Sequence, residues 1–260
     1  MKCEIQAAEE AIREVRRLIH DAQRVVVLTG AGISTDSGIR DFRGPHGLWT
    51  ENPLAEKMAT LHHYMSDPEI RKRAWKSRLD SASQRREPND GHRALVALER
   101  QGKLRTLITQ NTDGLHQKAG SSPEIVVEIH GNTREVLCTS CGDRLPIEQI
   151  LERVRAGEDD PHCHICEGVL KSATISFGQP LVKEDLARAK HAAQACDLLL
   201  AVGTTLAVHP IASIVPLAKE SGAQVVIMNG EPTAMDHLAD QILHGPISEL
   251  LPRIVGGTDE

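Results

Sequence analysis

Short apolar runs recur along the chain, and helix-length segments separate them. The runs are Val25 to Thr29, Leu104 to Thr109, Ile125 to Ile129, Asp197 to Val202 and Gln224 to Met228. A short, continuous apolar run is typical of a strand buried on both faces, as in parallel sheets covered by helices. The alternation of such strands with helical segments predicts an α/β fold with a doubly wound parallel sheet.

Two stretches interrupt this pattern, and we expect them to form a second, smaller lobe. Residues 46–89 look helical, and residues 136–171 carry two cysteine pairs. The chain has 260 residues, 40% of them hydrophobic, which is enough for one large domain with insertions. Residues 5–20 have apolar positions at three- and four-residue intervals, which predicts an amphipathic helix before the first strand.

The composition of the chain limits the kinds of partner that it can bind. The formal net charge is -6, and the chain has only two Phe, two Trp and one Tyr, so it lacks the basic and aromatic surfaces that nucleic acids require. No segment approaches the roughly 20 apolar residues of a membrane helix, and residues 1–20 are charged throughout. We therefore expect a soluble, cytoplasmic protein with neither a nucleic acid nor a membrane as partner.

Four of the six cysteines lie in two Cys-x-x-Cys pairs. The pairs are Cys138 with Cys141 and Cys163 with Cys166. Each pair can give two thiolates to one tetrahedral zinc ion, and we favour this over a redox pair or buried free thiols. Because four thiolates fill the coordination shell, we expect one structural Zn²⁺ per chain with no catalytic part.

The first strand ends in a glycine-containing loop. The loop begins Gly30, Ala31, Gly32, Ile33, Ser34. Glycines here let backbone N–H groups approach a pyrophosphate, although a simple strand-to-helix turn would also explain them. The continuation places Asp41, Phe42 and Arg43 in a glycine-bounded loop. Such a loop suits a cofactor clamp in which Phe42 shields a reactive carbon and Arg43 meets a phosphate.

Polar and small residues also follow the other predicted strands. They are Gln110, Asn111 and Asp113 after the second strand, His130 after the third, Gly203, Thr204 and Thr205 after the fourth, and Asn229, Gly230 and Glu231 after the fifth. The carboxyl ends of parallel strands share one edge of a sheet, so these loops should converge as a dinucleotide site requires. Helix caps and plain connections are the alternatives for each loop. His130 is a candidate general base, and Glu231 a candidate acceptor of ribose hydroxyls.

In this order, the motifs resemble those of the sirtuin family over about residues 22–250. They are Gly30 to Ser34, Asp41 to Gly44, Thr109 to Asp113, His130-Gly131, the cysteine pairs, Phe177-Gly178 and Gly203 to Thr205. The resemblance implies a transferase that uses NAD to remove acyl groups from protein lysines, giving nicotinamide and O-acyl-ADP-ribose. It also implies a Rossmann-like NAD-binding domain of residues 1–45, 90–135 and 172–255, with 46–89 and 136–171 as the small lobe.

The resemblance assigns roles to individual residues. His130 becomes the general base, Asn111 orders the ribose and a water, and Asp113 binds the nicotinamide amide. Phe42 covers the nicotinamide side, Arg43 helps to hold the cofactor, and Ile247 is a further expected cofactor contact.

The resemblance also implies that an acyl-lysine peptide adds as a strand near Phe177 and Val208. Trp75 and Arg78 align with the Tyr and Arg with which desuccinylating sirtuins admit an acidic acyl chain. Since an indole replaces the phenol, we expect deacetylation to dominate over a weaker desuccinylation. Gln179 stands where Glu usually follows Phe-Gly, which leaves the flanking preference of the substrate open.

Other functions remain compatible with these residues. A protein mono-ADP-ribosyltransferase would use the same NAD chemistry, and a desuccinylase-dominant deacylase would use the same fold. A non-catalytic NAD sensor would not need His130, Asn111 and Asp113 together. A dehydrogenase is disfavoured because the glycine fingerprint is incomplete.

Overall fold

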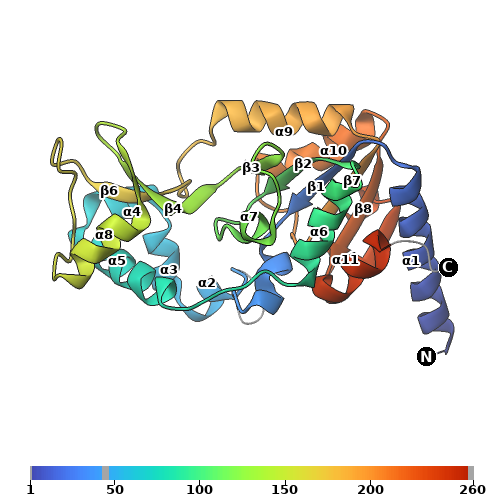
Figure 1. Ribbon diagram of the computed structural model, residues 1–260, viewed down its shortest axis with the longest axis horizontal. Coiled ribbons are helices and arrows are strands. Elements are labelled where there is room, and N and C mark those ends of the chain that lie inside the picture. The colour runs from blue at the N-terminus through green and yellow to red at the C-terminus, as the bar shows by residue number, and fades with distance from the viewer. Residues whose placement is uncertain (1, 43–46, 257–260) are drawn as a thin grey trace.

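The computed structural model describes residues 2–42 and 47–256, and its centre is a six-stranded parallel sheet (Figure 1). The strands are β1 (Val25–Thr29), β2 (Leu104–Thr109), β3 (Val126–Glu128), β7 (Leu198–Val202), β8 (Gln224–Asn229) and β9 (Gln241–His244). Their order is β3-β2-β1-β7-β8-β9, the doubly wound arrangement predicted from the apolar runs. The edge strand β9 was not predicted, because its sequence Gln-Ile-Leu-His is short and only partly buried.

Helices cover both faces of this sheet (Figure 1). One face carries α1 (Lys2–Asp21), α6 (Asp90–Arg100) and α11 (Ile247–Val255), and the other carries α9 (Lys183–Ala195) and α10 (Ile214–Glu220). Strand side chains alternate between the two layers: Val25 and Val27 join the first core, and Val26 and Leu28 join the second. This double burial explains why the strands appear in the sequence as continuous apolar runs.

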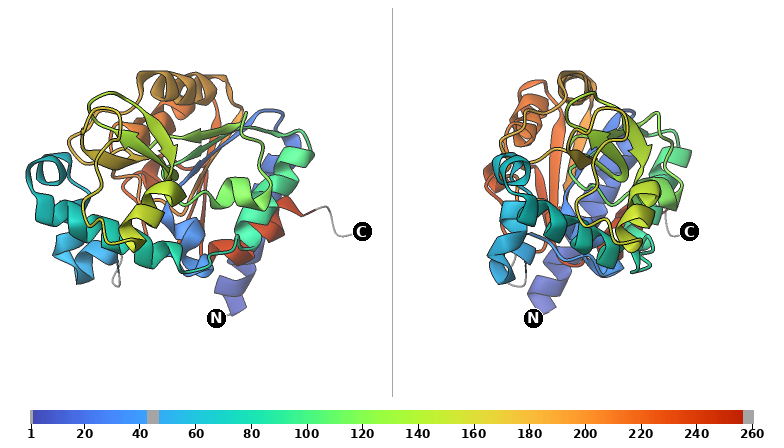
Figure 2. Two further views of the ribbon diagram at one scale, coloured as in Figure 1. Left: turned by 60° about the vertical axis from the view of Figure 1, so that its left-hand side comes forward. Right: turned by 90° about the vertical axis from the view of Figure 1, so that its left-hand side faces the viewer.

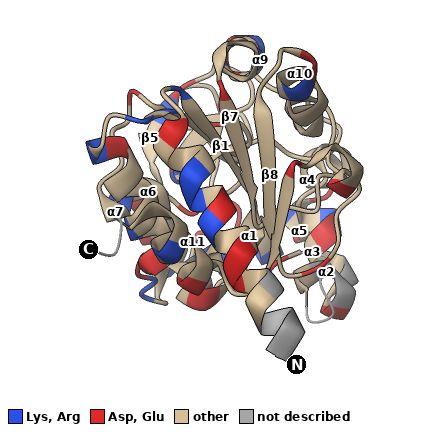
Figure 3. Cartoon of the chain, turned by 90° about the vertical axis from the view of Figure 1, so that its right-hand side faces the viewer, with Lys and Arg blue, Asp and Glu red and all other residues tan. Residues whose placement is uncertain are grey.

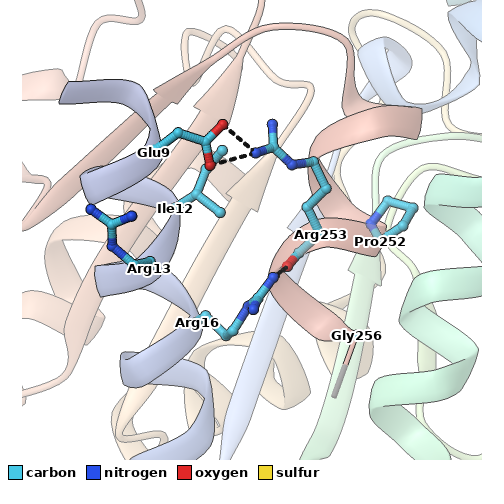
Figure 4. Close-up of a pocket in the computed structure, with 7 residues that line it drawn as sticks. All are labelled: Glu9, Ile12, Arg13, Arg16, Pro252, Arg253 and Gly256. Carbon is cyan, nitrogen blue, oxygen red and sulfur yellow. Dashed lines mark hydrogen bonds and ion pairs between the residues drawn. The ribbon is translucent and has the colours of Figure 1, made fainter. Parts of the chain in front are cut away.

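The helices α1 and α11 pack against each other on the first face (Figure 4). Arg253 pairs with Glu9 at 2.7 Å, and Arg16 donates from Nη2 to the Arg253 carbonyl at 2.7 Å. A cavity of about 530 Å³ lies between the two helices, and its described lining includes none of the predicted site residues. Figure 3 shows acidic and basic residues mixed along these helices, whereas strands β1, β7 and β8 carry no charge.

A second lobe lies beside the sheet and combines helices with a small antiparallel sheet (Figure 2). Its elements are α2 (Leu48–Glu51), α3 (Pro53–Met58), α4 (Leu61–Ser66), α5 (Pro68–Ala82), β4 (Gly131–Cys138), β5 (Arg144–Pro146), α8 (Ile147–Arg155) and β6 (Leu170–Thr174). The strand order is β5-β4-β6, a sheet that the sequence did not predict. Trp75 of α5 is completely buried in this lobe's core, against Val136, Ile150, Leu151 and Leu170.

A buried ion pair ties the helical and cysteine-containing parts of the small lobe together. Arg71 of α5 donates from both Nε and Nη2 to the Asp160 carboxylate, at 2.8–3.0 Å. Both side chains are nearly buried. Nearby, the Tyr64 hydroxyl donates to the Leu170 carbonyl at 2.8 Å, which fixes α4 to β6. Across residues 2–42 and 47–256, no helix is long and apolar enough to cross a membrane.

Candidate active site

The order of the large sheet reverses between β1 and β7, and the loops after these strands touch. The Gly30 N–H donates to the Val202 carbonyl at 3.0 Å, and the Gly32 N–H donates to the Gly203 carbonyl at 2.8 Å. A Cβ on Gly32 would lie 2.7 Å from Gly203 Cα. The glycines are therefore required by the contact of one loop with the other, a reason that the sequence alone did not reveal.

Open α/β sheets bind ligands outside the carboxyl ends of their strands, at the position where the strand order reverses. The short 3₁₀ helix η1 (Ala31–Ser37) begins there and carries Ser34 inward, where its side chain is buried. The geometry thus places the first predicted loop at the predicted ligand-binding edge.

Ser34 is the centre of a buried polar cluster. Its hydroxyl donates to Asp113 Oδ2 at 2.8 Å and accepts from Asn111 Nδ2 at 3.2 Å. Asn111 also donates to the Gly30 carbonyl at 3.0 Å, and the Leu115 N–H donates to Asp113 Oδ1 at 2.9 Å. Burial raises the pKa of Asp113, while the hydrogen bonds from Leu115 and Ser34 oppose that shift. The residues predicted on separate loops are thus brought together.

His130 follows β3 and is held in one tautomer. Its Nδ1 lies 3.1 Å from the carbonyl oxygen of Gln110. Because a carbonyl only accepts, Nδ1 carries the proton in the neutral ring and Nε2 keeps its lone pair. Burial lowers the pKa of His130, so the ring is neutral at pH 7 and suited to act as a base. Gln110 in turn donates from Nε2 to Thr204 Oγ1 at 2.9 Å, which joins the β2 and β7 loops.

The other predicted cofactor residues that the structure describes differ in their burial and contacts. The Asn229 side chain donates to the Glu231 carbonyl at 2.7 Å, and the Ala234 N–H donates to the Thr205 carbonyl at 3.3 Å. Thr205, Gly230 and Glu231 are exposed, and Phe42 is 41% exposed beside the half-buried Asp41. Ile247 starts α11 with its side chain in the core, and Arg43 lies outside the described residues.

The four predicted cysteine ligands converge at one point in the small lobe. Their Sγ atoms all lie within 4.8 Å of one another, with 3.5 Å between Cys138 and Cys166 and 3.7 Å between Cys141 and Cys163. A tetrahedral zinc ion with Zn–S bonds of about 2.3 Å requires S···S separations of about 3.8 Å, so the site fits zinc. The His162 ring faces the Asp160 carbonyl at 2.9 Å instead of joining the cluster.

Comparison with known proteins agrees with this geometry. Residues 30–210 match the model of the Sir2 family. The chain belongs to the Sir2 family, the sirtuins. A Streptomyces coelicolor protein named NAD-dependent protein deacetylase 2 is 50% identical over 233 residues, which are 90% of this chain and 97% of the relative. A Rhodopseudomonas palustris NAD-dependent protein deacetylase is 40% identical over 94% of this chain and 96% of its own length.

Solved sirtuin structures share the fold over nearly the whole length. A structure described as the basis for the mechanism and regulation of Sir2 enzymes superposes with a TM-score of 0.86 at 36% identity, covering 95% of this chain and 97% of the other. A Sir2 complex with a p53 peptide and NAD⁺ gives a TM-score of 0.82 at 32% identity, covering 94% and 96%.

The segment after β6 lines the predicted peptide region of this sirtuin. The Phe177 N–H donates to the Ala59 carbonyl, and the Phe177 carbonyl accepts from the Leu61 N–H, both at 2.9 Å. These two backbone groups are therefore already paired within the chain. Gln179 closes a turn, because its Oε1 accepts from the Ser176 N–H at 3.3 Å. The Val208 carbonyl likewise accepts from the Ala212 N–H at 3.0 Å.

Trp75 and Arg78 of this sirtuin differ in their surroundings. Trp75 is enclosed in the small-lobe core, and the Arg78 guanidinium lies 4.7 Å from the centre of its ring. Arg78 Nε donates to Ser172 Oγ at 2.6 Å, and the nearby Lys171 Nζ donates to the Ser172 carbonyl at 3.1 Å. Burial, and then the Arg78 charge, lowers the pKa of Lys171 to about 8. Trp75 Nε1 and Arg78 Nη1 are buried donors without an acceptor in the described part of the chain.

Sequence reasoning missed two buried histidines behind the Ser34 cluster. His116 Nε2 lies 3.0 Å from Thr29 Oγ1, and His92 Nε2 lies 3.5 Å from Ser34 Oγ. The two rings are 5.0 Å apart. Burial lowers the pKa of His116 to about 3 and that of His92 to about 4, so both are neutral at pH 7. His116 belongs to the polar segment that follows β2, but no spacing rule indicated that it faces His92.

Proposed function

We propose that this sirtuin is an NAD-dependent protein-lysine deacylase, a transferase that acts mainly as a deacetylase. The proposal depends on His130, whose Nδ1 faces the Gln110 carbonyl and leaves Nε2 unprotonated, next to the loop whose Asn111 and Asp113 are hydrogen-bonded to Ser34. The products are the free lysine, nicotinamide and O-acyl-ADP-ribose. The deacetylases and deacylases among its relatives, which match almost end to end, support the same activity.

NAD supplies an electrophilic ribose carbon and nicotinamide as leaving group. Around it, the proposed role of Asp113 is to accept a hydrogen bond from the nicotinamide amide, and that of Asn111 is to orient the ribose. His130 takes a proton from a ribose hydroxyl, because its neutral Nε2 is available. The loops at Gly30–Ser34, Gly203–Thr205 and Asn229–Glu231 hold the rest of the dinucleotide with the help of Arg43, while Phe42 covers the nicotinamide side.

The two lobes have different proposed roles. Residues 1–45, 90–135 and 172–255 bind NAD, while residues 46–89 and 136–171 form the zinc-containing lobe. The zinc ion has a structural role, because four thiolates leave no open position for water. Acylated proteins are the proposed partners. A cytoplasmic location for this sirtuin is supported by its four cysteines, which cluster as metal ligands, a pattern typical of a reducing compartment.

The decisive assay follows acetylated peptide and NAD by mass spectrometry, for wild type and His130→Ala. Loss of a general base lowers rates by about 10²–10⁴-fold, so the variant should be nearly inactive with its zinc content unchanged. His191→Ala, on the exposed side of α9, is the matched control. Near-normal deacetylation by His130→Ala would refute the mechanism. ADP-ribosylated protein as the main product would instead favour the mono-ADP-ribosyltransferase.

Acyl preference is tested with a succinylated peptide. The proposal is a weaker desuccinylation in which Arg78 pairs with the acyl carboxylate, supported by the unpartnered buried Nη1. A charge-assisted hydrogen bond contributes about 1.5–3 kcal/mol, so Arg78→Met should remove the desuccinylation. Trp75→Tyr should raise it, because the substitution restores the phenol that desuccinylating sirtuins carry. If wild type cleaves succinyl-lysine faster than acetyl-lysine, the desuccinylase-dominant alternative is correct.

A further inference from the structure

Arg134, at the start of β4, lies against the loop that carries Asp113. Its guanidinium is held in a bidentate pair with Glu128 of β3, with Nη1 to Oε1 at 2.8 Å and Nη2 to Oε2 at 2.6 Å. A Cβ built on Gly114 would lie only 2.7 Å from Arg134 Nη1. The arginine therefore covers the residue that directly follows Asp113.

Gly114 is the point at which this loop turns into a helix. It has φ of +72° and precedes α7 (Leu115–Ala119). Glycine adopts this left-handed conformation without penalty, but for the same reason its backbone is unusually free to move. A planar guanidinium that lies on Gly114 and is anchored through both Nη atoms restricts that freedom.

The rest of the loop is held from both sides. On the β4 side, Thr133 donates to the Thr112 carbonyl from its N–H at 3.1 Å and from Oγ1 at 2.8 Å. On the opposite side, Ser34 donates to Asp113 at 2.8 Å. The same β4 segment that begins one residue after His130 thus also supports the loop from 112 to 114.

We propose that Arg134, anchored by Glu128, is a positioning residue for NAD that fixes Gly114 and thereby aims the Asp113 carboxylate at the nicotinamide amide. This inference rests on the proposed role of Asp113. The positive charge of Arg134 also opposes the rise that burial causes in the pKa of Asp113, which favours the acceptor form.

An ordinary surface ion pair would not have this effect. The Arg134 side chain is 45% exposed, and exposed pairs stabilise a fold only slightly. Arg144 of β5 provides a control, because it pairs with Glu135 of β4 at 2.9 Å and is 53% exposed. Both arginines belong to the small sheet and form an exposed pair with a glutamate, Arg134 through two nitrogens and Arg144 through one, but it is Arg134 that contacts Gly114.

The test measures steady-state kinetics with acetylated peptide, NAD and nicotinamide as inhibitor. Arg134→Met should raise both the KM for NAD and the inhibition constant of nicotinamide by roughly three- to tenfold. The KM for peptide should stay within about twofold, since a loosened loop affects only the cofactor side. Arg134→Lys and Glu128→Gln should give intermediate values, and Arg144→Met should match wild type in all three constants.

Asp113→Asn, measured in parallel, distinguishes a failure of the role proposed for Asp113 from a failure of the positioning role proposed for Arg134. If it leaves the nicotinamide inhibition constant unchanged, the role of Asp113 in the proposed function fails, and the role of Arg134 fails with it. If Asp113→Asn raises that constant but Arg134→Met behaves like Arg144→Met, only the positioning role is refuted. The positioning role would also be refuted if Arg134→Met raised the KM for NAD and the KM for peptide equally. It would likewise be refuted if the variant had a lower unfolding temperature but unchanged constants for NAD and nicotinamide. Should Arg134→Met not fold, the lysine and Glu128→Gln variants decide.

Discussion

The buried histidines His92 and His116 should make the stability of this sirtuin fall steeply as pH drops below about 6.5. Burial lowers their pKa from 6.5 to about 4 and about 3 in the folded chain. Between those values and pH 6.5, the unfolded chain binds protons that the folded chain does not. By linkage, the stabilisation is complete above pH 6.5 and is lost as pH falls toward the folded values.

The magnitude follows from these shifts. Each pH unit below 6.5 removes about 1.4 kcal/mol per histidine from the free energy of unfolding. At pH 5, each ring has therefore lost about 2 kcal/mol relative to pH 7.5, and the pair about 4 kcal/mol. This is a large fraction of the roughly 5–15 kcal/mol by which domains are stable.

The assay is urea unfolding at a series of pH values from 7.5 to 5, for wild type and His116→Gln. Glutamine cannot titrate, so the variant should lose about 2 kcal/mol less than wild type over this range. The difference in pH-dependent stability between wild type and His116→Gln isolates His116. The other contributions affect both proteins, namely thiolate protonation, the raised pKa of Asp113 and the lowered pKa of His130. His191→Gln controls for the substitution. Equal pH dependence in wild type and His116→Gln would refute the reasoning.

Three further outcomes are expected from the geometry. Cys163→Ala should lower the zinc content below one per chain by metal analysis and destabilise the small lobe, because three thiolates leave the shell incomplete. Gly131→Ala should reduce deacetylation on the order of 100-fold in a kinetic assay, because its Cβ would lie 2.0 Å from the Ala173 carbonyl oxygen and displace the neighbouring base. Arg71→Met should lower the free energy of unfolding by about 3–5 kcal/mol, since Asp160 would remain a buried, unpaired charge, and adding Asp160→Asn should restore part of that loss.

Much of the candidate site could be predicted from local sequence, because its residues follow strands that are easy to recognise. Parallel strands bring their carboxyl ends to one edge whatever the intervening chain does, so Ser34, Asn111, Asp113 and His130 were expected to converge. The cysteine pairs were predictable for a similar reason, since two-residue spacing already suits one metal ion. The spacing of residues in the sequence did not predict which way each side chain points or which residues it contacts in the folded chain.

Trp75 and Arg134 illustrate that limit. Trp75 lies on a helix whose periodicity did not reveal that its ring would be enclosed in the small-lobe core. Nothing in the sequence singled out Arg134, and the fold places it against Gly114, twenty residues earlier in the chain. The short strand β9 and the β5-β4-β6 sheet were missed because half-exposed strands lack the continuous apolar runs of buried ones.

The sequence by itself determined the layered architecture, the cysteine cluster and the candidate reacting groups, because apolar periodicity, cysteine spacing and loop chemistry are local properties of the chain. Only the tertiary structure decided the protonation and orientation of those groups. Burial lowers the pKa of His130, the Gln110 carbonyl fixes its Nδ1 proton, and Gly32 must be glycine because Gly203 lies against it. Both effects arise from contacts between segments far apart in the chain, and such contacts exist only after the strands have paired.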